Sequence, residues 1–202
     1  MKRLITFTVV FTLVCCTSCK PPDNDEEEGK KPEVVIPPKK YVVGNYYNVN
    51  GVQGIVYDVD ADSLHGKIIS MDETDSPWGN NLNETGATDA YDGMKNMTNV
   101  KEKDIANYPA FKWCNDKGSG WYLPSQNELW DIVELHGDLQ DSLEFHQGIK
   151  FSSPGQYWSS TELRVVGSLQ EFQNASAVSF PIPVASYVEK TTPRKVRAIR
   201  AF

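Results

Sequence analysis

The residues best suited to ligand chemistry lie at positions 72–99, in the run DETDSPWGNNLNETGATDAYDGMKNMTN. The rings of Trp78 and Tyr91 are flat faces on which a sugar can stack, and the surrounding carboxylates and amides can bond its hydroxyls. The candidate ligand-binding residues are Asp75, Trp78, Asn80, Asn81, Tyr91 and Asp92. The same oxygens suit a calcium shell. The alternative is that Trp78 fills the core and the Asn and Asp side chains cap the loop.

A second acidic group has the spacing of a calcium-binding loop. Asp58, Asp60 and Asp62 stand at its first, third and fifth positions. Ser63 occupies the sixth position, where such loops need Gly, and Ile69 the twelfth, where they need Glu. No cofactor is therefore expected, calcium stays a minor alternative, and the identity of any metal is open.

The motifs of known catalytic sites are missing from the sequence. It contains no G-x-S-x-G, H-E-x-x-H, P-loop or dinucleotide fingerprint. Cys114 is the one cysteine after position 19, and no spacing directs a histidine toward it, which favours a buried inert thiol. We expect a non-catalytic protein, with a glycosidase that uses paired carboxylates as the least favoured alternative.

The first residues predict export and lipid attachment. Lys2 and Arg3 precede an uncharged, mostly apolar run at 4–14, which has the length of a signal-peptide core and is too short to span a bilayer. Thr17, Ser18 and Cys19 resemble the end of a bacterial lipobox. Residues 1–18 are therefore expected to be a lipoprotein signal peptide, with Cys19 as the lipidated residue. Modification at Cys16 and a plain secretory signal are the alternatives.

Residues 19–40 are predicted to be the lipidated cysteine and a disordered tether. Positions 20–40 hold five prolines and charge blocks of both signs, a composition that buries too little surface to fold. The acidic run at 23–28 resembles a signal for the outer face of the bacterial outer membrane, although a solvated linker explains it equally well. The net charge of −7 argues against nucleic acid as a partner.

Residues 41–202 are expected to form one domain that begins with a hairpin. Residues 54–60 alternate, with Ile55, Tyr57 and Val59 on one face, and a turn at 61–64 leads to a strand at 65–71. The segment 72–99 shows no periodicity and is expected to be a functional loop or to hide short elements.

Helices are predicted after this loop. Pro109 suits the first turn of a helix that ends near Asp116. Ser125 and Glu128 form a capping box, and the helix that follows is expected to stop at Gly137, before a short helix at 139–147.

Three strands are predicted last, at 157–162, 177–180 and 196–202. Arg197 is expected to be exposed or paired with Glu128 or Glu162. The tryptophans at 113, 121, 130 and 158 are interpreted as mostly core.

The motifs GWYLPSQNELWDIV, YWSSTE, AVSF and KVRAIRAF, in that order, resemble the Lcl C-terminal domain family and the related Fibrobacter succinogenes major paralogous domain. This resemblance implies an α+β fold of the C-type-lectin-like kind, with a twisted antiparallel sheet, two or three helices and a long loop region. It also implies a location on the bacterial surface and a role as an adhesin.

Together these features predict a non-catalytic cell-surface lipoprotein that binds glycan or a surface protein through its 72–99 loop face. The alternative is a structural or accessory subunit of a surface appendage or outer-membrane complex. In that case the candidate edge strands for pairing with another chain are Val165, Val166 and the run at 181–188.

Overall fold

The computed structural model describes residues 38–168 and 171–202, and Pro38–Phe202 form one compact unit. The predictions for residues 1–37, including lipidation at Cys19, concern positions outside the described residues. Within the described part no helix is both long enough and apolar enough to cross a membrane. The helices are α1 (Gly93–Lys101), η1 (Ile105–Asn107, one 3-10 turn), α2 (Pro109–Asp116), α3 (Gln126–Glu134) and α4 (His136–Phe145).

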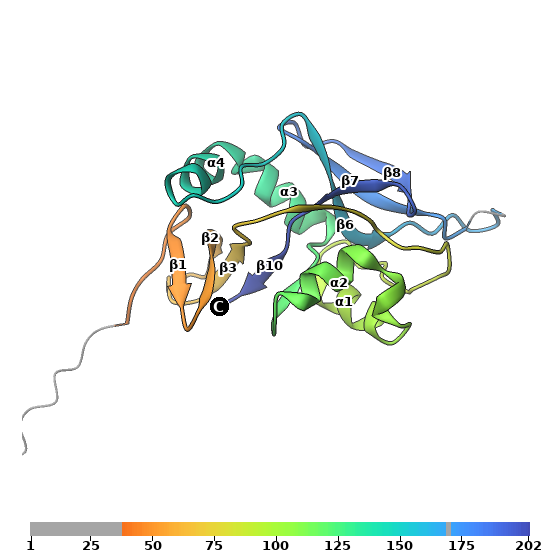
Figure 1. Ribbon diagram of the computed structural model, residues 1–202, viewed down its shortest axis with the longest axis horizontal. Helices are drawn as coiled ribbons and strands as arrows, with labels where there is room; N and C mark the ends of the chain where they lie inside the picture. Colours follow the sequence, from red (N-terminus) through yellow and green to blue (C-terminus); the bar gives the residue numbers. More distant parts are fainter. Residues whose placement is uncertain (1–37, 169–170) are drawn as a thin grey trace, which may run out of the picture. The chain divides into compact units, whose positions relative to one another are not determined.

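Two five-stranded sheets lie beside these helices (Figure 1). The first sheet is antiparallel and runs β1 (Tyr46–Val49), β2 (Val52–Val59), β3 (Gly66–Ile69), β10 (Ile199–Ala201), β5 (Trp121–Tyr122). The second runs β4 (Thr74–Pro77), β9 (Pro193–Val196), β6 (Gly155–Glu162), β7 (Asn174–Phe180), β8 (Ala185–Glu189), and its β6–β9 pair is parallel. The fold is therefore mixed α+β with two sheets, as the sequence predicts at the level of class.

The predicted hairpin forms, but its faces differ from simple alternation. β2 pairs with β3, and the register shifts between Val56 and Asp58. Ile55, Val56 and Tyr57 are all buried, and so are Ile69 and Ile68, the β3 partners of Ile55 and Val56, which shows that both faces of the sheet are covered at this point. The expectation that only alternate residues of this strand face inward is therefore wrong at Val56.

The helix signals are confirmed where they are local. Pro109 opens α2, and α3 has the predicted capping box, with the Ser125 hydroxyl and the Glu128 carboxylate each accepting the other's backbone N–H. The predicted stop at Gly137 is wrong. α3 ends at Glu134, because the backbone of the next residue, Leu135, leaves the helical region. α4 then starts at His136, so that Gly137 lies inside a helix.

The predicted strand at 196–202 is in fact two strands in different sheets. β9 belongs to the second sheet and β10 to the first, and the chain passes between them at Arg197 and Ala198. The segment from β3 to β4 makes the same passage from sheet to sheet. These two crossing segments lie side by side, because Ser70 N–H donates to the Ala198 carbonyl at 2.8 Å.

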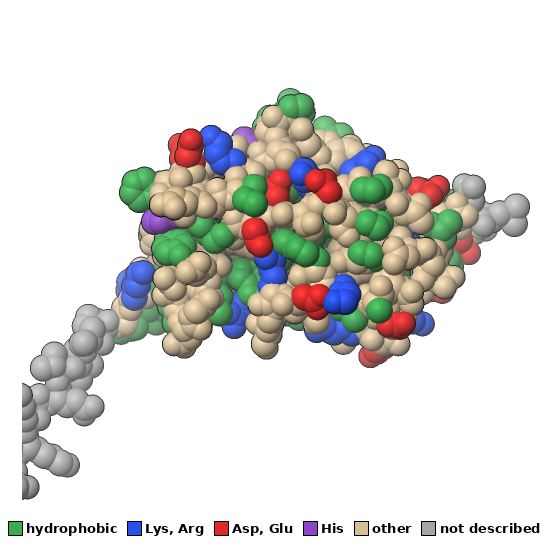
Figure 2. Space-filling model, viewed as in Figure 1, with side chains coloured by type: hydrophobic (Ala, Val, Ile, Leu, Met, Phe, Trp, Pro, Cys, Tyr) green, Lys and Arg blue, Asp and Glu red, His purple; other side chains and the backbone are tan. Residues whose placement is uncertain are grey.

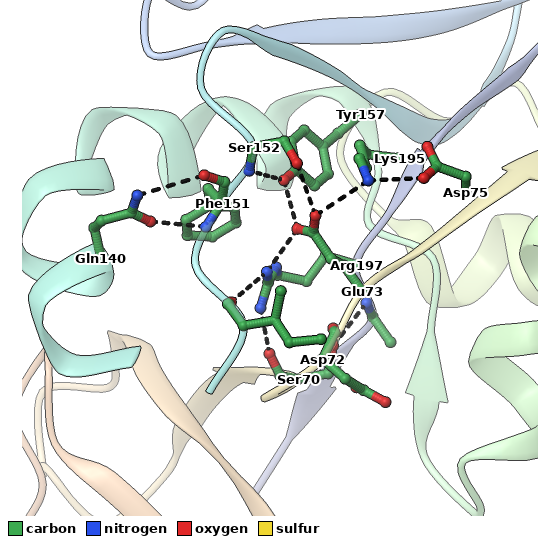
Figure 3. A network of polar contacts seen from close by, with 12 residues as sticks. Ser70, Asp72, Glu73, Asp75, Gln140, Phe151, Ser152, Tyr157, Lys195 and Arg197 are labelled. Atoms are coloured by element: carbon green, nitrogen blue, oxygen red, sulfur yellow. Dashed lines mark hydrogen bonds and ion pairs between the residues drawn. The ribbon is translucent and has the colours of Figure 1, made fainter. Parts of the chain in front are cut away.

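Arg197 ties the two crossing segments together (Figure 3). Its guanidinium is 1% exposed and donates to the Glu73 carboxylate at 2.7 Å and to the carbonyls of Ser70 and Ile149 at 2.8 Å. Tyr157 donates to the same carboxylate at 2.5 Å. The predictions that Arg197 is exposed or pairs with Glu128 or Glu162 are wrong, since its partner is Glu73.

The surface carries charges of both signs. On the face shown in Figure 2, acidic, basic and apolar side chains are interspersed. Single apolar side chains on a surface are ordinary and need no partner.

Candidate functional site

Trp78 is part of the core. Its side chain is 0% exposed, its indole N–H donates to the Ser159 carbonyl at 2.8 Å, and its ring meets Tyr108 and Phe111 edge to face. A ring with no exposed surface cannot stack on a sugar. The expectation that Trp78 binds ligand is therefore wrong, and the alternative, that it fills the core, is confirmed.

The loop that follows Trp78 is fastened by a buried ion pair between Lys190 and Glu162, both with side chains 0% exposed. The Glu162 carboxylate accepts the backbone N–H groups of Thr85 and Gly86 at 3.0 to 3.1 Å, and Lys190 Nζ donates to the Asn83 carbonyl at 2.9 Å. We call these contacts the Glu162 clamp. In this clamp each buried charge has a partner of opposite charge, which offsets the free-energy cost of removing it from water.

The Lys190 ammonium also lies over the Trp78 ring, 4.7 Å from its centroid. Burial lowers the pKa of Lys190, and the hydrogen bond and charge of Glu162 oppose that shift. The clamp and Trp78 thus form one buried unit that holds residues 78–87 in place. This part of the expected binding loop has a structural role.

Three other candidate residues make local contacts. Asp75, on β4, pairs with Lys195 Nζ at 2.7 Å. The Asn80 backbone N–H donates to the Asn107 carbonyl at 2.8 Å, and the Asn81 side-chain oxygen accepts the Asn83 N–H at 3.1 Å. Asp75 and Asn80 are exposed and Asn81 is half-buried, and their ligand-binding role stays a prediction.

The last part of the segment presents Tyr91 to solvent. The Asp89 carboxylate accepts the backbone N–H groups of Tyr91 and Asp92 at 2.9 and 3.0 Å, which makes a tight turn. Asp92 then caps α1 by accepting the Lys95 N–H at 2.9 Å. The Tyr91 side chain, on this fixed turn, is 77% exposed. Asp92 is accounted for as a helix cap, whereas the Tyr91 ring contributes to a surface hollow.

That hollow has a volume of about 410 Å³ and is lined by Tyr91, Asn127, Trp130 and Asp131. The last three residues stand at i, i+3 and i+4 on α3, so that one helix face presents them. The Asn127 backbone N–H donates to the Ala90 carbonyl at 2.9 Å and so fixes the Tyr91 turn beside α3. We call this the Tyr91–Trp130 hollow.

The electrostatics of the hollow are acidic. Partial burial raises the pKa of Asp131, and the neighbouring carboxylates of Glu134 and Asp58 raise it further, while Lys67 acts in the opposite direction. Lys67 donates to the Glu128 carboxylate at 3.0 Å and is thereby largely neutralised. A ligand here meets two aromatic rings, an amide and a carboxylate.

Sequence reasoning missed Asn127, Trp130 and Asp131. The prediction that Trp130 belongs to the core with the other tryptophans is wrong, because Trp130 is only partly buried and lines the hollow. The helical period carried the signal, since Leu129, Ile132 and Val133 form the buried face of α3 and Trp130 falls outside it.

Two further hollows of about 430 Å³ are less suited to stacking. One is lined mainly by Gln156, Ser179, Phe180 and Arg194, and Phe180 is 2% exposed. The other lies beside Trp121, whose ring is 7% exposed, and beside an ion pair of Lys117 with Asp72. Neither hollow offers an aromatic face as open as that of Tyr91.

The calcium-like spacing at 58–62 is divided between two elements, with Asp58 on β2 and Asp62 in the turn that follows. Asp62 accepts the Leu64 N–H at 2.7 Å and contacts the His65 ring at 3.0 Å. Among residues 38–168 and 171–202, no three or more His, Cys, Asp or Glu side chains gather in a way that could hold a metal ion. Burial also raises the pKa of the Cys114 thiol far above its usual range.

Comparisons with known proteins support the fold at a coarse level. No family model matches the chain, and no curated protein matches it. Its structure is similar to that of a fimbrial protein from Bacteroides ovatus ATCC 8483, with a TM-score of 0.63 and 18% identity over 80% of this chain. The match covers 49% of the fimbrial protein, and at that identity the likeness concerns the fold alone.

Proposed function

We propose that this chain is a non-catalytic cell-surface lipoprotein that binds glycan through the Tyr91–Trp130 hollow. The observation that carries the proposal is an aromatic side chain 77% exposed beside a second aromatic, an amide and a carboxylate in one hollow. Sugar rings have apolar faces that stack on aromatics and hydroxyls that need hydrogen-bond partners. Tyr91 and Trp130 line one hollow together, and a concave site with aromatic rings and a few polar groups has the usual composition of a small-molecule site, which favours a role in binding.

The proposed binding face differs from the one that the sequence predicts, whereas the family resemblance stays part of the proposal. The C-type-lectin-like fold and the kinship to the Lcl C-terminal domain remain part of it, on the sequence motifs. The binding face consists of the Tyr91 end of the 72–99 segment together with α3. Under this proposal Asn127 and Asp131 supply the polar contacts to the sugar directly, without calcium.

The anchor supplies the location. Acyl chains on Cys19 would hold the protein in the bacterial outer membrane, and residues 20–40 would carry the domain away from the lipid surface. The partners under this proposal are the membrane, through the anchor, and an external glycan. Globomycin treatment of the native host tests the anchor: we expect the unprocessed precursor to accumulate, and unchanged processing would contradict lipidation.

The direct test of binding is a glycan array probed with the full chain in detergent, once with calcium and once with EDTA. We expect selective binding in both arms, and its loss in the variant Tyr91→Ala. Thr98→Ala, at an exposed site on α1, serves as the matched control. A blank array in both arms contradicts the proposal.

A second candidate is a structural subunit of a surface appendage. It is supported by the fold likeness to a fimbrial protein and by β8, an edge strand with an exposed Tyr187 (55%) next to an exposed Ile182 (69%) and Val184 (55%). Unpaired edge strands are sites of strand addition. Cross-linking on intact cells tests it: a high-mass adduct lost in Tyr187→Lys supports this role, and no adduct in either chain argues against it.

A further inference from the structure

The charge around the Tyr91–Trp130 hollow is unbalanced. Asp131 lies in the hollow, and the carboxylates of Asp58, Glu128 and Glu134 are close enough to act on it. The cation that acts against them is Lys67, and its Nζ is bonded to Glu128 at 3.0 Å. Without the Lys67–Glu128 pair, three carboxylates remain: Asp58 on β2, and Asp131 and Glu134 on α3.

The neighbouring charges on the α1 side do not correct this excess. Lys95 Nζ pairs with Asp89 at 3.0 Å, and the Asp92 carboxylate accepts the Lys95 backbone N–H in the first turn of α1. The ammonium groups of Lys67 and Lys95 thus each have a carboxylate partner. The potential that a ligand meets is therefore negative.

The Glu128 carboxylate is not available to a ligand, because both of its oxygens already accept hydrogen bonds within the protein. It accepts bonds from Tyr122 at 2.9 Å, from Lys67 at 3.0 Å, and from the backbone N–H groups of Gly93 and Ser125 at 3.1 and 2.9 Å. By contrast, no hydrogen bond to the Asp131 carboxylate is found within the described part of the chain. Of these carboxylates Asp131 is the one that lines the hollow, and it is left for a ligand.

Aromatic rings beside a carboxylate favour one kind of ligand charge. The face of a Tyr or Trp ring attracts a cation, and a carboxylate attracts it further. A ligand carboxylate or sulfate is repelled by Asp131 and gains nothing from the ring faces. A neutral hydroxyl can still form hydrogen bonds in the hollow, but it gains no attraction from these charges and suffers no repulsion.

We propose that the Tyr91–Trp130 hollow selects sugars that carry a protonated amine, such as oligomers of 2-amino-2-deoxyhexoses, over neutral sugars and over acidic ones. Asp131 holds the ammonium group, Asn127 bonds a hydroxyl, and the rings of Tyr91 and Trp130 take the apolar faces. This inference rests on the proposed glycan binding and adds the class of sugar.

The test is titration calorimetry of the full chain in detergent with four tetrasaccharides of equal length, at a pH where the amine is protonated. The probes are oligomers of glucosamine, N-acetylglucosamine, glucose and galacturonic acid. We expect the glucosamine oligomer to bind about tenfold more tightly than the acetylated and neutral ones, and the acidic oligomer to bind most weakly. Because the preference is electrostatic, added salt should reduce it.

Two variants separate the charge effect from damage to the fold. Asp131→Asn keeps the shape and removes the charge, and Asp138→Asn removes an exposed charge on α4 as the control. We expect Asp131→Asn to bind the glucosamine and acetylated oligomers equally well, and Asp138→Asn to keep the amine preference.

The outcomes are distinguishable. Equal binding of the amine and acetylated oligomers by the unaltered chain overturns this inference and leaves glycan binding standing. An amine preference that survives Asp131→Asn overturns it as well. Failure of all four oligomers to bind contradicts the proposed function itself.

Discussion

The two halves of the 72–99 segment have similar compositions and different structures. Residues 78–87 are held by the buried Trp78 and by the Glu162 clamp, whereas residues 89–92 form a short turn that presents Tyr91 to solvent. Asn, Asp, Gly and Thr make up eight of the fourteen residues at 72–85 and eight of the fourteen at 86–99. The difference comes from partners far away in sequence, since Lys190 and Ser159 reach the first half and α3 supports the second.

The role of a polar loop therefore depends on which other parts of the protein its side chains contact, and not on its composition. In the first half the ring is enclosed and the backbone N–H groups point to a buried carboxylate. In the second half the turn satisfies its own backbone and leaves the ring free. The following changes should affect the two halves differently.

The largest effect is expected from the clamp. Lys190→Met removes the cation and leaves the Glu162 carboxylate buried without its charge partner, so the free energy of unfolding should fall by about 3 to 5 kcal/mol. Urea denaturation measures it. The double variant Lys190→Met with Glu162→Gln should recover part of the loss, because no uncompensated charge remains, and a change below about 1 kcal/mol in the single variant would contradict a stabilising clamp.

A smaller effect is expected at the junction between the turn and α1. Asp92→Ala removes the side-chain acceptor that caps the helix, and should cost about 1 kcal/mol. Thermal unfolding measures this loss. Asp92→Ser, which keeps a capping oxygen, should restore most of the stability, and equal losses in both variants would speak against the cap.

Next in size is the exposed half itself. Tyr91→Ala should change the free energy of unfolding by no more than about 0.5 kcal/mol, since the ring buries little surface. Denaturation and the glycan array, run on the same preparation, measure stability and binding together. A large loss of stability would show that Tyr91 belongs to the core, as Trp78 does.

The smallest effect is a dependence on pH at Asp131. Its pKa is raised in the folded state, so the folded protein favours the protonated acid, and this contribution to stability is lost as pH rises through the folded pKa. Asp131→Asn should therefore become more stable relative to the unaltered chain as the pH rises from below the usual Asp range to neutral. Solvent screening keeps the gain to about a few tenths of a kcal/mol, and an opposite trend in denaturation midpoints would contradict the acidic environment.

Sequence patterns predicted the elements whose signals are local. The Ser125 and Glu128 capping box, Pro109 at the start of α2 and the β2–β3 hairpin each depend on residues only a few positions apart. The sequence carries no local signal for β4 inside the loop-rich segment, or for the division of the predicted strand at 196–202 into β9 and β10. Both are defined by the passage from one sheet to the other, which the buried Arg197–Glu73 pair holds together.

The candidate site was predicted only in part for the same reason. Tyr91 could be named from its polar surroundings, but its neighbours on α3 become neighbours only when Asn127 N–H bonds the Ala90 carbonyl. Trp78 has the same surroundings in sequence, and only the fold shows that Ser159 and Lys190 enclose it.

The most direct test compares Tyr91→Ala with Trp78→Phe in glycan binding and in unfolding, using one set of conditions. We expect Tyr91→Ala to lose binding while its unfolding midpoint stays unchanged. Trp78→Phe should unfold earlier and still bind the glycan below its midpoint. Binding that survives Tyr91→Ala but is lost in folded Trp78→Phe would contradict the assignment of structure to the first half of the segment and binding to the second.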